Sequence, residues 1–325
     1  MMSQIINLVA DIGGTNIRLG TFEHESAVTA LKVYQCGNYQ SLSEVIRTYI
    51  NEENLTGKTI NACLAIACPV ENDLISMTNL PWEFSQKALK AELSLNKLLL
   101  INDYTAIAHA VPYLNDDQKV QIGDGEVVSS KPISICGPGT GLGVANVVPL
   151  AQGQWQALGG EGGHVDFAPV DQTEIQILEF LLNKYQHVSY EQLLSGLGLE
   201  QIYQALNHIE QSDKPTLSAQ EISEKALSNT CQLCEKSLAQ FCKVLGSFAG
   251  NLALTLASFG GVYIAGGIVP RFIDYLKQSE FRSRFESKGR ITFNQTIPTF
   301  VITESQPGIL GASAYLRQHN LHNKG

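Results

Sequence analysis

The chain has 325 residues, of which 44% are hydrophobic and 16% charged, a composition typical of a well-packed globular protein with two domains or lobes. Its net charge of −9 and isoelectric point near 5.3 argue against nucleic acid as the main partner, because phosphate backbones require a basic surface. A single nucleotide is still compatible with this charge, since backbone N–H groups and a metal ion can hold its phosphates.

The N-terminal segment and the cysteines indicate a cytoplasmic protein. The first apolar run, from Ile5 to Asp11, has no basic region before it, is interrupted by Asn7 and is too short to span a membrane. The seven cysteines are therefore expected to be reduced thiols. Cys231 and Cys234 form a Cys-x-x-Cys pattern that suggests zinc or redox chemistry. They lie in a helical pattern without a second ligand pair nearby, so a plain packed helix is favoured.

The first glycine-rich segment lies between two short apolar runs. Residues 5–10 and 17–22 predict buried strands, and residues 11–16 form the turn that joins them. Adjacent glycines allow tight turns and close approach to the backbone, so one interpretation is an ordinary hairpin turn. The other is a phosphate cradle, in which N–H groups bind the anion, Thr15 donates its hydroxyl and Asp11 faces a phosphate-bound metal.

Helix and strand patterns then alternate. The pattern predicts, in order, a helix over residues 40–52, strands over 60–69 and 74–79, and a helix that Pro81 opens and that runs to Leu93. Residues 97–101 form a continuous apolar run, which indicates a buried strand in a sheet covered by helices on both faces.

Asn102 and Asp103 follow this strand directly. Ligands collect beyond the carboxyl ends of the strands in open α/β sheets, so Asp103 is a carboxylate placed to accept a substrate proton. The alternative is a helix cap, because a helical pattern follows at 105–110 and Asp favours N-caps. The other motifs of the chain favour the functional interpretation.

A second unit of strand, glycine turn and strand follows a polar stretch at residues 115–131. Residues 132–136 and 144–148 flank the turn Gly137-Pro-Gly-Thr-Gly-Leu-Gly143, which repeats the N-terminal arrangement. Neither turn is a Walker A loop or a dinucleotide fingerprint, because the lysine and the glycine spacing of those motifs are missing. Two such turns could hold one polyphosphate from two sides.

Residues 158–166 place Glu161 and His164 among four glycines. Little packing is available there, so these two side chains suit contact with a ligand better than a place in a core. The alternative is a mobile surface loop with incidental polar residues. Glu191 lies in a helical pattern at 189–194, where a lone Glu usually complements the helix dipole.

The C-terminal part combines long helical patterns with two strands. Residues 262–265 predict a strand that runs into Gly266 and Gly267, where a flat adenine and its ribose could rest against the backbone. The other expected elements are helices over 173–186 and 221–258, a helix from Pro270, a strand over 297–302 and a small-residue helix over 307–316.

In their order along the chain, these motifs resemble the bacterial ATP-dependent glucokinase family. The resemblance covers about residues 5–318 and rests on Asp11–Asn16, Ile101–Asp103, Gly137–Gly143, Gly160–His164 and Ala265–Pro270, with Met77–Asn79 and His187–Glu191. It implies an α/β, two-lobed actin/hexokinase-like (ribonuclease H-like) fold. Each lobe would have a mixed five-stranded sheet flanked by helices, with the active site in the interlobe cleft. The small lobe would comprise residues 1–113 plus 304–325, and the large lobe residues 114–303.

The resemblance also implies a reaction and its residues. ATP would phosphorylate D-glucose at the 6-hydroxyl to give glucose 6-phosphate and ADP, the entry step of glycolysis, with Mg²⁺ as cofactor. Asp103 would be the general base, and Asp11 would bind Mg²⁺ through water. The sugar-binding residues would be Asn79, Asn102, Asp103, Glu161, His164 and Glu191. The nucleotide-binding residues would be Ala10, Asp11, Ile12, Gly13, Gly14, Thr15, Asn16, Gly137, Gly139, Thr140, Gly141, Gly266 and Gly267.

The sequence departs from related patterns at two points. Ala10 stands where Gly is common in these enzymes. The sugar motif is Glu161-Gly-Gly-His164 rather than the Glu-x-Gly-His form of the related zinc-containing sugar kinases and repressors. The clustered cysteine signature of that group is also missing after His164, so we expect no structural zinc. Family resemblance implies a homodimer, and the net charge and the N-terminal segment lead us to expect a cytoplasmic protein without a nucleic-acid or membrane partner.

Other functions fit parts of this pattern. A kinase for another hexose, such as fructose, mannose or an N-acetylated sugar, would use the same motifs. A sugar-sensing regulator on this fold would carry an N-terminal helix-turn-helix, for which a strand beginning by residue 5 leaves no room, and it would need the opposite net charge. An ATPase chaperone of the same superfamily would need a peptide-binding domain, for which no segment is a candidate.

Overall fold

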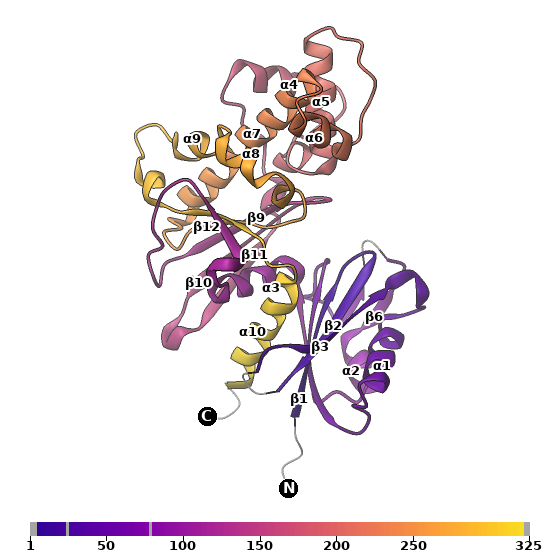
Figure 1. Cartoon of the computed structure of the whole chain (residues 1–325). Helices are drawn as coiled ribbons and strands as arrows, with labels where there is room; N and C mark the ends of the chain where they lie inside the picture. The colour runs from indigo at the N-terminus through magenta and orange to yellow at the C-terminus, as the bar shows by residue number, and fades with distance from the viewer. Residues whose placement is uncertain (1–4, 24–25, 78–79, 322–325) are drawn as a thin grey trace. The chain divides into compact units, whose positions relative to one another are not determined.

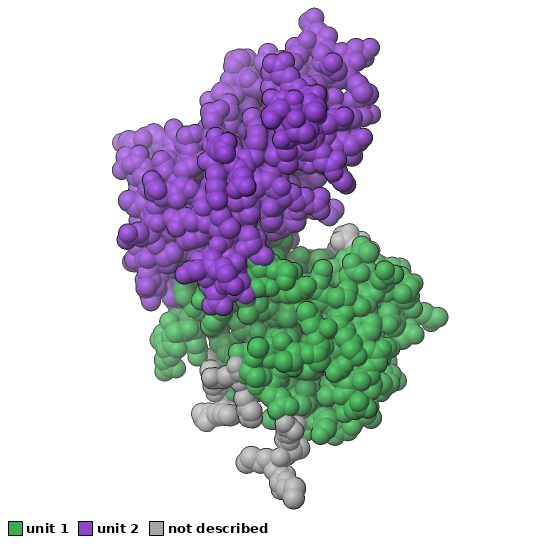
Figure 2. Space-filling view, viewed as in Figure 1, with its two compact units in different colours: residues 1–114, 150–159, 304–325 green, residues 115–149, 160–303 purple. Residues whose placement is uncertain are grey.

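The computed structural model describes residues 5–23, 26–77 and 80–321, and the chain divides into two compact units (Figures 1 and 2). Unit 1 comprises residues 1–114, 150–159 and 304–325, and unit 2 comprises residues 115–149 and 160–303. Two mixed sheets flanked by helices confirm the predicted α/β class. No helix within the described residues is long and apolar enough to cross a membrane.

Unit 1 is built on a five-stranded sheet in the order β3-β2-β1-β4-β7. Strand β1 pairs in parallel with β4, and β4 with β7, whereas β2 runs antiparallel to β1 and β3. The strands are β1 (Ile5–Ile12), β2 (Asn16–Phe22), β3 (Thr29–Gln35), β4 (Thr59–Ile66) and β7 (Lys97–Asn102). Ile12 lies opposite Ile66, and Ile66 opposite Asn102, so the three parallel strands end at the same edge.

Helices cover both faces of this sheet, because successive residues of a strand point to opposite faces. The even-numbered residues of β1 enter a core shared with α1 (Leu42–Glu52) and α2 (Gln86–Glu92). Val9 belongs to the core shared with α3 (Asp103–Ala110) and α10 (Pro307–Leu321), which pack together (Figure 1). Asp11 follows Val9 on this second face. The C-terminal helix therefore reaches the face on which the first glycine turn presents its carboxylate.

The second sheet has six strands in the order β11-β10-β9-β12-β13-β8, one more than the resemblance implied. Its strands are β8 (Lys119–Ile122), β9 (Ile133–Pro138), β10 (Leu142–Pro149), β11 (Trp155–Gly160), β12 (Val262–Ile264) and β13 (Thr299–Ile302). Strand β12 is parallel to β9 and β13, while β10 and β8 run antiparallel to β9 and β13. Strand β8 lies in the polar stretch 115–131. A polar sequence can form it because β8 is a short strand at the edge of the sheet, where little apolar sequence is needed.

The helices of unit 2 surround one large hydrophobic core. They are α4 (Gln172–Leu182), α5 (Gly196–Ile209), α6 (Ala219–Leu227), α7 (Gln232–Leu256), α8 (Ile273–Gln278) and α9 (Phe281–Glu286). The predicted core face of the longest helix is confirmed, since Leu238, Phe241, Leu245 and Phe248 of α7 are all buried.

Two predicted helices have different bounds, and capping side chains explain both. The helix expected over 81–93 begins at Gln86, because Ser85 accepts a hydrogen bond from the N–H of Ala88 as its N-cap. The residues before it form a two-stranded hairpin of β5 (Leu74–Ser76) and β6 (Glu83–Ser85).

The long helical pattern over 221–258 is divided into α6 and α7. Cys231 is the N-cap of α7, and its Sγ accepts a hydrogen bond from the N–H of Cys234 at 3.4 Å. This capping contact explains the spacing of the two cysteines within a helix. All seven cysteines are free thiols, and six of them are buried.

Candidate active site

The first glycine turn joins β1 to β2 in unit 1. The N–H of Gly13 donates to the carbonyl of Asn16 at 3.0 Å, which closes the turn. Cys36 supports it from the side, because its N–H donates to the carbonyl of Thr15 at 2.9 Å and its Sγ donates to the carbonyl of Gly13 at 3.5 Å. Gly14 and Thr15 are exposed at the tip. The turn thus presents N–H groups and a hydroxyl to solvent, as the phosphate-cradle interpretation requires.

Asp11 lies between a cation and the start of the C-terminal helix. Its Oδ2 is 3.5 Å from Nη1 of Arg18, the residue opposite it on β2. A Cβ added at Gly308, in the first turn of α10, would lie 2.8 Å from the Asp11 carboxyl carbon, so glycine is needed there. Burial raises the pKa of the Asp11 carboxyl, and the Arg18 charge acts in the opposite direction.

Asp103 follows the last residue of β7 and is the first residue of α3. The helix cap is Asn102, whose Oδ1 accepts hydrogen bonds from the N–H groups of Tyr104 at 2.9 Å and Thr105 at 3.3 Å. The capping role considered for Asp103 therefore belongs to its neighbour. The Asp103 carboxylate accepts a bond from the Tyr104 N–H at 2.9 Å and stays partly exposed.

The electrostatic surroundings of Asp103 suit a base. Burial raises the pKa of its carboxyl to about 6, and the nearby Asp11 charge adds to this shift. Hydrogen bonds from the Tyr104 N–H and the Asn102 side chain act in the opposite direction. A carboxylate with this pKa is largely ionised at neutral pH and binds a proton more strongly than an ordinary aspartate.

The second glycine turn joins β9 to β10 in unit 2. The N–H of Gly139 donates to the carbonyl of Gly141 at 2.8 Å, and the N–H of Gly196, at the start of α5, donates to the carbonyl of Gly139 at 2.9 Å. Gly266 has a φ of +87°, and a Cβ there would lie 2.4 Å from the carbonyl oxygen of Pro138. Two predicted nucleotide-binding segments, the second turn and the Gly266 segment, therefore lie in direct contact.

The glycines beside Glu161 and His164 allow their segment to pack closely on β10. A Cβ at Gly163 would lie 2.1 Å from the carbonyl oxygen of Leu142, and one at Gly162 would lie 3.0 Å from the Val144 side chain. These residues form a 3₁₀ turn, η5 (Gly162–His164), which leaves His164 exposed. The segment is thus a turn packed closely against the sheet.

Glu191 connects this turn to the second glycine turn. Residues 165–167 pair with 188–190 through N–H bonds from Tyr190 to Val165 and from Phe167 to Val188. This pairing brings Oε1 of Glu191 to 3.9 Å from Nε2 of His164. The other oxygen, Oε2, accepts a bond from the Leu142 N–H at 2.8 Å, and a Cβ at Gly141 would lie 2.5 Å from it.

Several predicted residues contribute differently or lie elsewhere. The side chains of Ala10 and Ile12 are buried in the core, so they would offer a ligand their backbone alone. Glu161 and Gly267 are exposed. Asn79 lies outside the described residues. Among the described residues, no three His, Cys, Asp or Glu side chains are grouped to hold a metal ion.

The family model described as Glucokinase matches residues 8–319. The chain belongs to the glucokinase family. It is 61% identical over 322 residues to the glucokinase of Colwellia psychrerythraea, with 97% of each chain covered. It is 47% identical to that of Tolumonas auensis, with 96% of this chain and 97% of the relative covered.

Solved structures agree with the family assignment. The crystal structure of a glucokinase from an Antarctic psychrotroph has a TM-score of 0.89 at 35% identity and covers 97% of this chain and 99% of that chain. A glucokinase from Balamuthia mandrillaris, crystallised in complex with glucose, has a TM-score of 0.76 at 22% identity, with 97% of this chain and 94% of that chain covered. This second likeness shows the shared fold.

Three residues near the glucokinase motifs are not marked by any of the sequence patterns above. Arg18 faces Asp11 because the two are paired across β1 and β2, a register that the hairpin turn could have indicated. Gly308 approaches Asp11 from the opposite end of the chain, and no local signal shows this contact. Gly196 supports the second turn from α5. The glycine-rich start of this helix has low helix propensity, so the sequence pattern did not predict α5 or its contact with the turn.

Proposed function

We propose that Asp103 is the general base of this glucokinase. The reaction of the family transfers a phosphoryl group from ATP to glucose and yields glucose 6-phosphate. The transition state of such transfers is loose, so the protein mainly positions the reactants and neutralises charge. The observation that carries the proposal is the raised pKa of a partly exposed carboxylate at the carboxyl end of a parallel strand. As the sugar 6-hydroxyl attacks phosphorus, Asp103 accepts its proton.

We assign the nucleotide phosphates to the two glycine turns. Gly14 and Thr15 of the first turn, and Thr140 of the second, are exposed, and each turn is closed by its own backbone hydrogen bond. Exposed N–H groups and hydroxyls in fixed turns are the donors that phosphate oxygens accept. The contact between Gly266 and Pro138 places the proposed adenosine segment beside the second turn.

We assign Mg²⁺ to Asp11. A phosphate-bound Mg²⁺ keeps several water molecules and needs one or two protein carboxylates, so the absence of a larger acidic cluster among the described residues is compatible with it. Asp11 fits this requirement as a partly exposed oxygen donor beside the first turn, near a second carboxylate at Asp103. When bound, the ion would neutralise charge on the phosphates.

We assign the sugar hydroxyls to Asn102, Glu161, His164 and Glu191, with Asn79 as a further candidate. The cap bonds occupy Oδ1 of Asn102, and its amide nitrogen also hydrogen-bonds Asp103, which leaves the second N–H of Nδ2 to donate to a hydroxyl. His164 and Glu191 lie close enough to contact neighbouring hydroxyls of one ring. A site with such paired polar groups rejects analogues that leave one of them unpaired.

We also propose the larger organisation that the family implies. Residues 1–113 plus 304–325 and residues 114–303 would act as two lobes of a cytoplasmic homodimer. The free thiols support a reducing compartment. Light scattering of the purified protein across a concentration series tests the dimer, and a monomer mass at all concentrations would contradict it.

The deciding experiment measures ADP release from Mg-ATP with glucose, fructose, mannose and N-acetylglucosamine. We expect the highest kcat/KM with glucose, and in Asp103→Ala a loss of kcat by several orders of magnitude while calorimetric glucose binding persists. Asp73→Ala is a matched control, because Asp73 accepts its bonds from Ser85 and Lys87 at the hairpin. Preference for another hexose would move the assignment to that sugar. Near-normal turnover in Asp103→Ala would remove the base.

A further inference from the structure

Tyr190 lies immediately before Glu191 and belongs to the hydrophobic core of unit 2. It is 3% exposed, its ring packs edge-on against Phe167 with centroids 5.6 Å apart, and it lies 4.8 Å from Phe248 of α7. Its N–H donates to Val165 at 3.1 Å, and its carbonyl accepts bonds from two later N–H groups of the same turn. The ring helps to hold η6 (Tyr190–Gln192) in place, together with the Ser195 hydroxyl, which donates to the Glu191 carbonyl at 2.8 Å, and Gln201, which donates to the Gln192 carbonyl at 2.9 Å.

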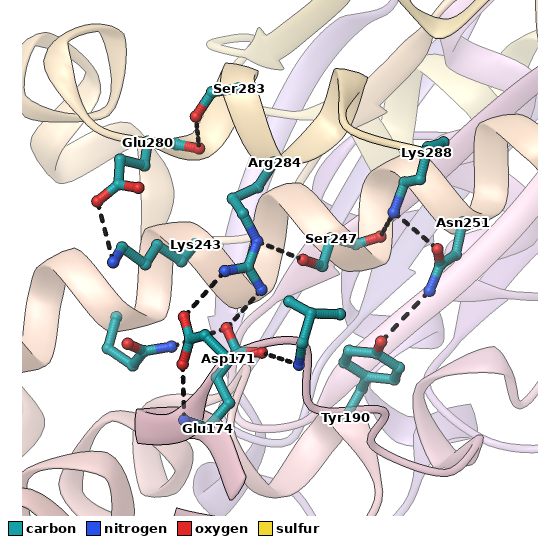
Figure 3. A network of polar contacts seen from close by, with 12 residues as sticks. Asp171, Glu174, Tyr190, Lys243, Ser247, Asn251, Glu280, Ser283, Arg284 and Lys288 are labelled. Carbon is teal, nitrogen blue, oxygen red and sulfur yellow. Dashed lines mark hydrogen bonds and ion pairs between the residues drawn. The ribbon is translucent and has the colours of Figure 1, made fainter. Parts of the chain in front are cut away.

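The hydroxyl of this ring belongs to a chain of polar contacts that crosses α7 (Figure 3), and it also hydrogen-bonds the backbone of Ala168. Asn251 donates from Nδ2 to the Tyr190 hydroxyl at 3.3 Å, and its Oδ1 accepts from Nζ of Lys288 at 2.8 Å. Lys288 also donates to the Ser247 carbonyl at 2.8 Å. The side-chain nitrogen and oxygen of Asn251 therefore each have one partner. The bond from Lys288 to the oxygen orients the amide so that its nitrogen faces Tyr190.

Close packing of α9 on α7 delivers Lys288 to this position. A Cβ at Gly246 would lie 2.2 Å from the carbonyl oxygen of Phe281, and one at Gly250 would lie 2.6 Å from that of Phe285 and 2.4 Å from Cε of Lys288. Burial lowers the pKa of Lys288 to about 8, and the neighbouring Arg284 charge acts in the same direction. The fold thus desolvates a cation in order to place it beside Asn251.

Arg284 anchors the other end of the same surface. It donates to Asp171 at 3.1 Å and to the fully buried Glu174 at 2.6 Å, and its Nε donates to the Ser247 hydroxyl at 3.1 Å (Figure 3). Arg284 is thus paired with carboxylates, whereas Lys288 donates to two neutral oxygens. The contacts of Lys288 orient a side chain rather than neutralise an acid.

We propose that Tyr190, held through its hydroxyl by Asn251 and Lys288, is a positioning residue for Glu191 and thereby controls the affinity of the enzyme for its sugar. The inference rests on the proposed role of Glu191 in binding glucose. Oε2 of Glu191 accepts a bond from the Leu142 N–H, so a shift of η6 would strain or break this bond and change the distance from Oε1 to Nε2 of His164, now 3.9 Å. Neither Tyr190 nor Lys288 is required to contact the substrate.

The test compares glucose binding and turnover in Tyr190→Phe, Lys288→Met and the double variant. One neutral hydrogen bond corresponds to about fivefold in an equilibrium constant, so Tyr190→Phe should raise the calorimetric Kd and the KM for glucose about fivefold while kcat and the KM for ATP stay within about twofold. Both changes interrupt the same chain of contacts. The glucose Kd of the double variant should therefore be no higher than that of whichever single variant has the higher Kd.

Tyr203→Phe and Lys243→Met are the matched controls. Tyr203 is 2% exposed and its hydroxyl donates to the Pro215 carbonyl at 3.1 Å, while Lys243 pairs with Glu280, so these changes cost stability without touching η6. They should leave the glucose Kd unchanged. A glucose Kd that rises equally in Tyr203→Phe, or that stays normal in Tyr190→Phe, would overturn the positioning role.

Glu191→Gln distinguishes this inference from the proposed function on which it rests. If Glu191→Gln weakens glucose binding and Tyr190→Phe does not, the sugar role of Glu191 stands and the positioning role is wrong. If Glu191→Gln binds glucose normally, the sugar role itself fails, and the positioning inference fails with it.

Discussion

At the scale of single residues, the environment of Asp103 predicts how activity depends on pH. The folded enzyme holds the pKa of this carboxyl at about 6, and a general base must be ionised to accept a proton. We therefore expect kcat/KM for glucose to fall about tenfold per pH unit below pH 6 and to level off above it. Asp103→Asn should leave a small residual rate that does not show this fall below pH 6. A pH profile that breaks near pH 4, as for an ordinary aspartate, would contradict the assignment.

The role of a residue was predictable where it depended on its immediate neighbours in the sequence. It was not predictable where it depended on a contact with a residue far away in the chain. Asp103 follows an apolar strand, so its place at the sheet edge could be inferred, and the structure confirms that place. It could not be inferred that Asn102 rather than Asp103 caps the helix, because Asn and Asp are equally good caps. Gly308 could not be connected with Asp11 at all, since the two lie 297 positions apart.

At the scale of elements, the glycine-rich turn η5 gives a sharp steric prediction. Gly163→Ala would place a methyl group 2.1 Å from the Leu142 carbonyl oxygen, so η5 would have to move away from β10. We expect about 1–3 kcal/mol of destabilisation in urea unfolding, together with weaker glucose binding, because His164 belongs to this turn.

Gly160→Ala is the control for this change. Gly160 lies three residues earlier, at the end of β11, and nothing lies within 4 Å of its Cβ position. This variant should unfold like the wild type. If the two alanine variants have the same unfolding midpoint, close packing is not the reason for the glycine at 163.

The pairing of α3 with α10 predicts an acid-sensitive contact. His109 of α3 is 3% exposed and packs edge-on against Tyr315, with ring centroids 4.9 Å apart. Burial, with a smaller contribution from His319, lowers the pKa of His109 to about 4 from the ordinary 6.5. The unfolded chain therefore binds a proton that the folded chain resists, so stability is present above pH 6.5 and is lost as the pH falls towards 4.

We expect His109→Phe to remove this part of the acid sensitivity while keeping an aromatic ring against Tyr315. Between pH 7 and pH 5 the wild type should lose roughly 2 kcal/mol more unfolding free energy than the variant, measured in urea at both values. Other groups titrate in both proteins and cancel in the comparison. Equal losses would mean that His109 is protonated in the folded state at pH 5.

Most elements were predictable from apolar periodicity, and the misses have physical causes. The strands at both glycine turns and the core face of α7 have the expected places. The helix expected from Pro81 starts later because Ser85 caps it, and the helix expected over 221–258 is interrupted because Cys231 caps its second half. The α5 helix was missed because two glycines stand in its first turn.

At the scale of the whole chain, the two ends of the sequence meet in unit 1 through a ladder of asparagines. Asn320 of α10 donates to Oδ1 of Asn7 at 3.0 Å, and its own Oδ1 accepts from Lys97 at 3.2 Å and from Asn61 at 3.5 Å. Asn7 and Asn61 are 5% and 4% exposed. An asparagine inside the apolar run of β1 signals a buried partner, but the sequence does not show that this partner lies 313 residues away.

This ladder should decide how firmly α10 is held on the sheet. Asn320→Ala leaves two buried amides short of a partner, so we expect a loss of about 1–3 kcal/mol in unfolding free energy. Because α10 also brings Gly308 to Asp11, the loosened helix should raise the KM for ATP more than the KM for glucose. Asn51→Ala is the control, since Asn51 is an exposed residue of the same unit that accepts a bond from Thr56. If Asn320→Ala and Asn51→Ala unfold at the same urea concentration, the ladder does not hold the C-terminal helix, and apolar packing against α3 must do so alone.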